Sequence, residues 1–135
     1  MTTLYLDTCA VIKLFKDEDD TDALKRWLED HASYRQVTSH LTIVELRRGL
    51  HACSAQPETH AVADLWLKQC ARIALTADVL RKAGSLLPGS RLRALDAIHV
   101  AAALELGAAL TYFVSYDKRL ISAAEHHGLP VVSPT

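Results

Sequence analysis

Short runs of residues with strand character alternate along this chain with longer segments in which apolar side chains recur at helical spacing. The first run, Leu4-Tyr5-Leu6, is apolar throughout, as in strands that are buried on both faces of a parallel sheet. The alternation predicts an α/β fold with a short, mainly parallel sheet flanked by helices. We expect strands at 4–6, 36–38, 73–75, 111–114 and 129–132, and helices at 10–15, 22–31, 39–53, 61–71, 76–86, 94–106 and 118–126.

The composition supports a folded domain that buries a core. Half of the 135 residues are hydrophobic and 23% are charged, which excludes an intrinsically disordered chain. No apolar stretch approaches the roughly 20 residues of a membrane span, and no signal or transit peptide is visible at the start. We therefore expect one domain over residues 1–135, in the cytoplasm and away from the membrane.

The three cysteines, Cys9, Cys53 and Cys70, are odd in number and widely spaced. This pattern supports neither a disulfide framework nor a structural zinc site. We expect three buried thiols in a reducing compartment.

Four acidic residues stand where the predicted architecture can bring them together. Asp7 directly follows the first strand and Asp117 comes just after the fourth, and the carboxyl ends of parallel strands meet at the sheet edge where ligands bind. Asp96 lies in the first turn of an Ala-rich helix, and Glu45 lies in the middle of the helix at 39–53. Converging carboxylates repel one another, and Mg²⁺ or Mn²⁺, which prefer oxygen ligands, would relieve that repulsion.

Each of these acids also has a purely structural interpretation. Asp7 and Asp117 are suitable helix caps, and Asp96 would complement the dipole of its helix. Glu45 lies opposite the apolar stripe of its helix and three residues before Arg48, so periodicity alone makes it a solvated residue in a surface ion pair. The hypothesis of a metal site therefore depends on the four acids as a set.

A histidine stands close to one of the acids. His99 follows Asp96 by three residues and so lies on the same side of the helix. A role as a metal ligand is open, but a packed and hydrogen-bonded imidazole is the expected one.

Four segments of the chain together form a recognisable pattern, although each alone is a weak signal. They are LYLDT at 4–8, TIVELRRG at 42–49, ALDAIHVAAA at 94–103 and VSYDKRL at 114–120. In this order and spacing they resemble the PIN-domain ribonucleases, and among them the VapC toxins of VapBC toxin–antitoxin modules. The resemblance covers nearly the whole chain and implies a single PIN domain with a three-layer α/β sandwich.

The resemblance also implies a mechanism and partners. The four acids would form the tetrad that binds Mg²⁺ or Mn²⁺, and a metal-activated water would cleave structured RNA such as tRNA or rRNA. Thr8 follows the first acid, as Ser or Thr often does in the family, and could bond an acid or a metal-bound water or equally cap the next helix. Ser115 stands two positions before the last acid, where a hydroxyl side chain often supports the site and Thr is more usual than Ser. Family members form homodimers, and a cognate VapB-type antitoxin inhibits them.

Arginines near the acids are candidates for contact with RNA. They are needed because the net charge of −1 lacks the basic excess that nucleic-acid binders usually carry. Each could equally be an ordinary solvated or ion-paired residue. The candidates are Arg47, Arg48, Arg91, Arg93 and Arg119.

Two other functions remain open at this point. A phosphoryl-transfer enzyme or receiver domain also places an Asp after its first strand. A dehalogenase-type enzyme would need a second Asp where this chain has Cys9, and a receiver would need an adjacent pair of acids. A catalytically silent PIN-like binding module is the second alternative, and a test of RNA cleavage with Mg²⁺ or Mn²⁺ distinguishes it from a nuclease.

Overall fold

The computed structural model of the chain describes residues 2–86 and 92–135, so the candidate Arg91 lies outside the described residues. Its centre is a five-stranded sheet in the order β3-β2-β1-β4-β5, and every neighbouring pair of strands is parallel. The strands are β1 (Thr3–Leu6), β2 (Arg35–Ser39), β3 (Ala71–Ile73), β4 (Leu110–Val114) and β5 (Val131–Val132). The prediction of a mainly parallel sheet is confirmed.

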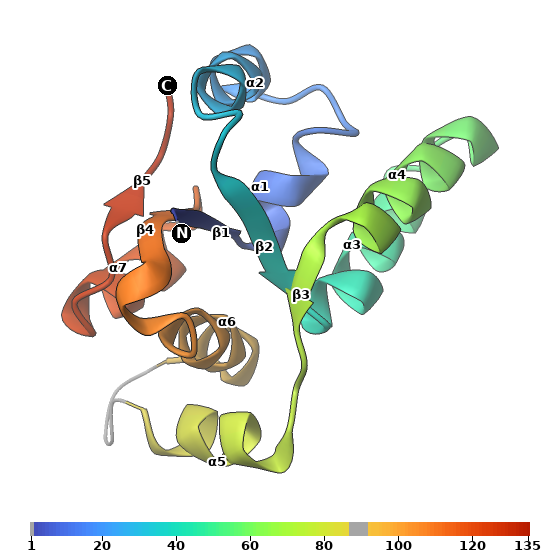
Figure 1. Ribbon diagram of the computed structural model, residues 1–135. Helices are drawn as coiled ribbons and strands as arrows, with labels where there is room; N and C mark the ends of the chain where they lie inside the picture. The colour runs from blue at the N-terminus through green and yellow to red at the C-terminus, as the bar shows by residue number, and fades with distance from the viewer. Residues whose placement is uncertain (1, 87–91) are drawn as a thin grey trace.

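Helices cover both faces of this sheet, which gives the fold three layers (Figure 1). The helices are α1 (Thr8–Ile12), α2 (Thr21–Asp30), α3 (Leu41–Ala52), α4 (Pro57–Gln69), α5 (Ala77–Ser85), α6 (Ala94–Leu104) and α7 (Lys118–His126). Leu4 and Leu6 of β1 join the core that includes α1 to α4, and Tyr5 between them joins the core with α6 and α7. Successive side chains of a strand point to opposite faces, so β1 belongs to both cores.

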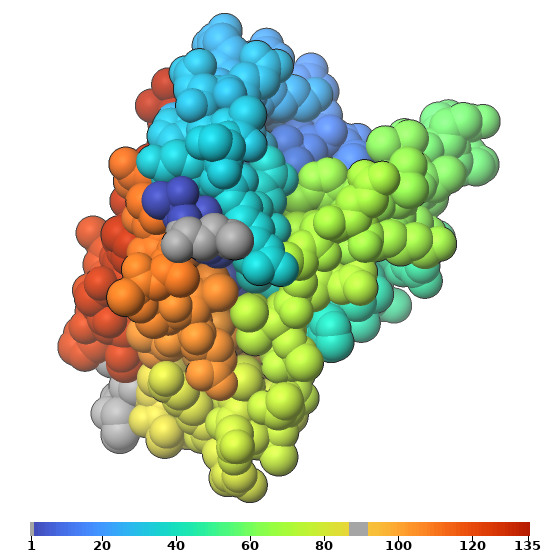
Figure 2. Space-filling view, in the orientation of Figure 1, coloured from blue at the N-terminus to red at the C-terminus, as the bar shows by residue number. Residues whose placement is uncertain are grey.

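One end of the α3–α4 hairpin projects from the rest of the molecule (Figure 2). Three large apolar side chains on these two helices are more than half exposed: Val44 at 56%, Val62 at 56% and Leu65 at 54%. Among the described residues, none of the helices combines the length and the apolarity needed to cross a bilayer.

The boundaries around α4 differ from the sequence prediction for local reasons. The helix begins at Pro57 instead of 61, because proline is well tolerated in the first turn, where its missing N–H has no helical acceptor. It ends at Gln69, since Cys70 is extended with φ −77° and ψ 140°. The next strand accordingly occupies 71–73 instead of 73–75, with Ala71 paired to Val37.

The thiols are less buried than predicted. Cys53, at the C-cap of α3, is exposed, while Cys9 and Cys70 are partly buried. The prediction was wrong for Cys53 because the buried stripe of α3 ends at Leu50. All three thiols are free.

Candidate active site

A pocket of about 480 Å³ lies at the carboxyl end of the sheet, and the four predicted acids line it. Asp7 reaches this edge because it directly follows β1, and Asp117 because it stands three residues after β4. Glu45 comes from α3 and Asp96 from the first turn of α6. The structure therefore brings the four acids to one pocket from four separate elements.

Asp7 is the most deeply buried of these acids, with 1% of its surface exposed. The backbone N–H of Ala10 donates to its Oδ1 at 2.9 Å, so Asp7 caps α1. The Ser115 hydroxyl donates to Oδ2, and the Cys9 thiol lies 3.1 Å from Oδ1 and 3.2 Å from Oδ2. One carboxylate thus caps a helix and lines the pocket.

Burial raises the pKa of Asp7, because a carboxylate is poorly solvated inside the protein. The charge of His99 and the hydrogen bonds from Ser115, Cys9 and Ala10 oppose this effect without cancelling it. Burial likewise raises the pKa of the Cys9 thiol, and the charge of Asp7 adds to that shift. Cys9 is therefore a protonated donor, and a nearby cation would stabilise the ionised form of Asp7.

Glu45 extends from α3 with 26% of its side chain exposed. The Thr8 hydroxyl donates to Oε1 at 2.6 Å, and His99 Nε2 lies 2.8 Å from the same oxygen. Burial acts to raise the pKa of Glu45, but the hydrogen bonds from His99 and Thr8 and the charge of His99 outweigh it, so the pKa is lowered. Arg48, the partner expected from periodicity, is exposed, and the polar partners of Glu45 are Thr8 and His99 instead.

Asp96 and Asp117 share one arginine. Nε of Arg93 lies 2.8 Å from Asp96 Oδ2, and its Nη2 lies 3.1 Å from Asp117 Oδ2. The Arg93 side chain is 50% exposed, compared with 10% for Asp96 and 35% for Asp117. Asp117 also caps α7, since its Oδ1 accepts from the backbone N–H of Arg119 at 2.9 Å. A solvent-accessible cation thus compensates this half of the pocket.

Both predicted supporting hydroxyls contact acids of the pocket. Thr8 donates to Glu45, and its Oγ1 also lies 3.0 Å from the Thr42 hydroxyl. Ser115 donates to Asp7 and accepts from the backbone N–H of Asp117 at 3.2 Å. Ser115 therefore connects the first acid of the chain to the last.

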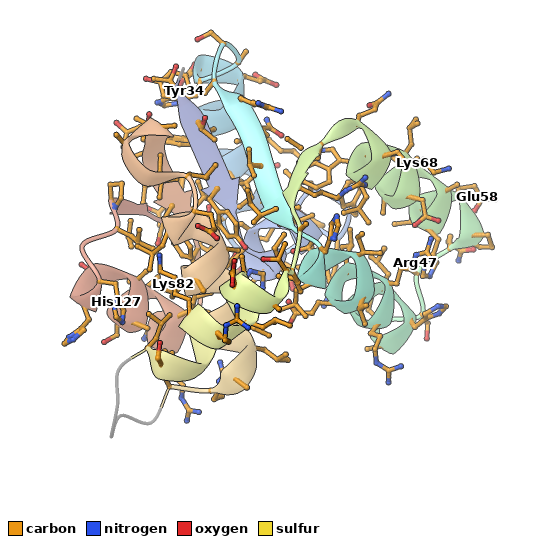
Figure 3. The ribbon with its side chains drawn as sticks, turned by 60° about the horizontal axis from the view of Figure 1, so that its bottom comes forward. Tyr34, Arg47, Glu58, Lys68, Lys82 and His127 are labelled. Carbon is orange, nitrogen blue, oxygen red and sulfur yellow. The ribbon has the colours of Figure 1, made fainter. Side chains whose placement is uncertain are left out.

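The candidate arginines divide between the pocket and the outer surface. Arg93 lines the pocket, whereas Arg48 and Arg119 are exposed outside its lining. Arg47, labelled in Figure 3, lies on α3 beside α4, where its Nε is 3.1 Å from Asp64 Oδ1. Its ion pair favours a structural role, and contact of these arginines with RNA stays a prediction.

Two features of the pocket were not predicted from the sequence. Cys9 contacts Asp7, and the only signal for this was its position two residues further on, in the first turn of α1. His99 is packed and hydrogen-bonded as expected, with 3% exposure, but its partners were not predicted. They are Tyr5, Thr8 and Glu45, which lie 94, 91 and 54 residues away in the chain.

The acids surround the pocket without forming a ready-made ligand cage. Within residues 2–86 and 92–135, no three His, Cys, Asp or Glu side chains already converge on one point as ligands of an ion. Arg93 holds one oxygen each of Asp96 and Asp117, and Thr8 and His99 hold Glu45 Oε1. A cation shared by these carboxylates would therefore compete with the guanidinium of Arg93 for Asp96 and Asp117.

Known proteins share this sequence pattern. The PIN domain family matches residues 4–126. The chain is 43% identical over 133 residues to ribonuclease VapC35 of Mycobacterium tuberculosis, a match that spans 97% of this chain and 96% of that protein. The chain therefore belongs to the PIN-domain family, and within it to the VapC ribonucleases. This membership sets aside the phosphoryl-transfer and receiver alternatives.

Solved structures share the fold at low sequence identity. VapC20 of Mycobacterium tuberculosis, a toxin that cleaves the sarcin–ricin loop, superimposes with a TM-score of 0.76 at 21% identity, covering 98% of this chain and all of that one. VapBC2 of Rickettsia felis, bound to a DNA fragment from its promoter, gives a TM-score of 0.75 at 16% identity, with coverage of 98% and 100%. These likenesses confirm the predicted PIN-type sandwich.

Proposed function

We propose that this chain is a divalent-metal-dependent endoribonuclease toxin, with Mg²⁺ or Mn²⁺ bound by Asp7, Glu45, Asp96 and Asp117. The main support is that four carboxylates from four separate elements line one pocket. An oxygen-rich set suits Mg²⁺ or Mn²⁺, whereas zinc sites usually include nitrogen or sulfur ligands. The buried Asp7 fits the same interpretation, because its raised pKa reflects a charge that a cation would stabilise.

The side chains of the pocket have distinct tasks in this proposal. A bound divalent ion would lower the pKa of water and stabilise charge on a phosphodiester. Asp7 and Glu45 offer oxygens already oriented by hydrogen bonds. Asp96 and Asp117 would exchange the guanidinium of Arg93 for the ion, which frees Arg93 for a phosphate of the RNA.

We infer that the substrate is a structured RNA, such as tRNA or rRNA. The support is membership of the VapC ribonucleases and the fold shared with a toxin that cleaves the sarcin–ricin loop. Because the net charge is −1, binding would depend on a small number of basic side chains, and its salt dependence would scale with the number of phosphates that they contact.

The expected protein partner is a VapB-type antitoxin. VapBC2 of Rickettsia felis is a complex with the same fold in its toxin chain. The exposed apolar side chains of Val44, Val62 and Leu65 on the α3–α4 hairpin are candidate contacts for such a partner. Expression of the toxin alone should slow growth, and co-expression of its antitoxin should restore it. The homodimer stays a prediction.

Cleavage of purified structured RNA tests the proposal. The protein should cut RNA with Mn²⁺ or Mg²⁺ and stop in EDTA, and Asp7→Asn and Asp96→Asn should each abolish cleavage while the fold is retained. Asp64→Asn is the matched control, because Asp64 lies outside the pocket and pairs with Arg47. If both pocket variants cut as fast as the parent, the tetrad is wrong. If no RNA is cut with either metal, the chain is a silent binding module.

A further inference from the structure

A hydrogen-bonded chain of side chains leads from the core of the protein to Glu45. Tyr5 of β1 is fully buried, and its hydroxyl lies 2.8 Å from His99 Nδ1. His99 of α6, 3% exposed, in turn places Nε2 at 2.8 Å from Glu45 Oε1. These hydrogen bonds therefore connect the central strand β1 with α6 and α3.

A charged His99 donates from both ring nitrogens, and for a neutral His99 one arrangement of protons satisfies both partners. Burial raises the pKa of Tyr5 far above its usual value, so the phenol keeps its proton and can donate it. A neutral imidazole has one donor and one acceptor nitrogen. If Tyr5 donates to Nδ1, the ring proton sits on Nε2 and points at the carboxylate of Glu45. Both polar ends of the buried ring are then satisfied.

This arrangement restrains a side chain that would otherwise be mobile. Glu45 has three rotatable side-chain bonds and sits in mid-helix, where a carboxylate would ordinarily extend into solvent. Within the described part of the chain, His99 and Thr8 both meet Oε1, which leaves Oε2 available to the pocket. The ring of Tyr5 is itself fixed, since it stacks on Phe113 with centroids 5.3 Å apart.

We propose that His99 and Tyr5 are positioning residues that hold Glu45 in its metal-binding orientation. The inference rests on the proposed function, because it presumes that Glu45 is a ligand. Partners that orient a ligand from outside the metal's own shell typically change metal affinity by about 10- to 100-fold when they are lost. α6 would thus supply one ligand, Asp96, and orient a second through His99 one turn later.

Mn²⁺ affinity, measured by calorimetry on the full chain, tests this role without any RNA. His99→Leu should weaken Mn²⁺ binding about 10-fold, and Tyr5→Phe, which removes one hydroxyl and keeps the stacked ring, should weaken it less. His99→Gln should restore most of the affinity, because its amide can still donate to Glu45. His51→Leu, on α3 outside the pocket lining, is the control and should change nothing.

A double-mutant cycle with Glu45→Gln separates positioning from general damage to the pocket. His99→Leu should have little further effect on Mn²⁺ affinity once Glu45 is Gln. An equal loss in both backgrounds would overturn the positioning role. If Glu45→Gln alone leaves Mn²⁺ binding unchanged, the proposed tetrad fails as well; if it weakens binding and His99→Leu does not, only the positioning role fails.

The proton arrangement has its own readout, which does not depend on the variants folding. Long-range ¹H–¹⁵N spectra of the metal-free protein should show a proton on Nε2 of His99. A proton on Nδ1 with a bare Nε2 would contradict the proposal, because His99 could not then donate to Glu45.

Discussion

The two halves of the acid pocket are compensated in different ways. Asp7, at the start of α1, and Glu45, in the middle of α3, receive hydrogen bonds from hydroxyl, thiol, backbone and imidazole groups. Asp96 and Asp117, at the starts of α6 and α7, share the guanidinium of Arg93. The first half is oriented by buried neighbours, whereas the second is neutralised by a half-exposed side chain.

Hydrogen bonds therefore orient the carboxylates of the first half, whereas an ion pair neutralises those of the second. A carboxylate held by hydrogen-bond donors keeps its direction, so it is prepared for a cation. A carboxylate in an ion pair must first lose its partner, so arginine and metal compete for the same oxygens. We therefore expect substitutions in the first half to act on catalysis and stability, and substitution of Arg93 to act on metal affinity.

The largest effect should come from removing charge in the oriented half. Asp7→Asn should lower RNA cleavage by at least about 100-fold, the loss typical for a group that stabilises the transition state. Asp117→Asn should cost less, because Asp117 is 35% exposed and other oxygens can take its place. Single-turnover cleavage rates with saturating Mn²⁺ measure both. A larger loss for Asp117→Asn would reverse the order proposed for the two halves.

Within the oriented half, the two acids should affect stability with opposite signs. The pKa of Asp7 is raised in the folded protein, so its charge destabilises the fold at neutral pH, and Asp7→Asn should raise the Tm in EDTA at pH 7. This increase in Tm should become smaller as the pH falls, because the unsubstituted protein itself then becomes protonated at Asp7.

For Glu45 the expected change in Tm has the opposite sign. Its pKa is lowered in the folded protein, so its charge stabilises the fold above the unfolded-state pKa, and this contribution is lost as the pH falls through the folded-state pKa. Glu45→Gln should therefore lower the Tm at pH 7, and the two variants should converge on the parent in acid. Thermal unfolding across a pH series checks both, and equal signs at pH 7 would contradict the comparison.

In the neutralised half, removal of the competing cation should strengthen metal binding. Arg93→Ala should raise Mn²⁺ affinity a few-fold, because Asp96 and Asp117 would then be free of their ion pairs. Arg47→Ala is the matched control, since Arg47 pairs with Asp64 outside the pocket. Unchanged or weaker Mn²⁺ binding by Arg93→Ala in calorimetry would show that the guanidinium does not compete.

The smallest effect should come from a single hydroxyl. Ser115 donates to the ionised form of Asp7, so Ser115→Ala should raise the pKa of Asp7 further. The acid limb of the pH–activity profile should then move to higher pH, with the rate at its plateau little changed. A shift to lower pH would indicate that Ser115 does not stabilise the carboxylate.

The positions of Asp7 and Asp117 could be predicted because they follow from topology. An acid directly after a strand of a parallel sheet must lie at the carboxyl edge, whatever the details of packing. The position of Glu45 in the pocket was harder to predict, because helical periodicity alone places its side chain in solvent. Its real environment is set by Thr8 of α1 and His99 of α6, which meet α3 only in the folded protein.

Only part of the role of Arg93 could be predicted from spacing. Its pairing with Asp96, three residues on, is a local helical contact, but its pairing with Asp117 depends on how α6 and α7 pack. The shift of β3 by two residues combines a local cause, the extended backbone at Cys70, with the pairing of β3 to β2.

One turn of α6 sets the positions of two acids of the pocket, Asp96 directly and Glu45 through His99. A helix turns by about 100° per residue, so one residue inserted between Asp96 and His99 would rotate the imidazole away from Glu45 while Asp96 stayed in place. The spacing between these two positions should therefore resist insertions and deletions more strongly than most of the helical surface, even though only one of the two residues carries a carboxylate.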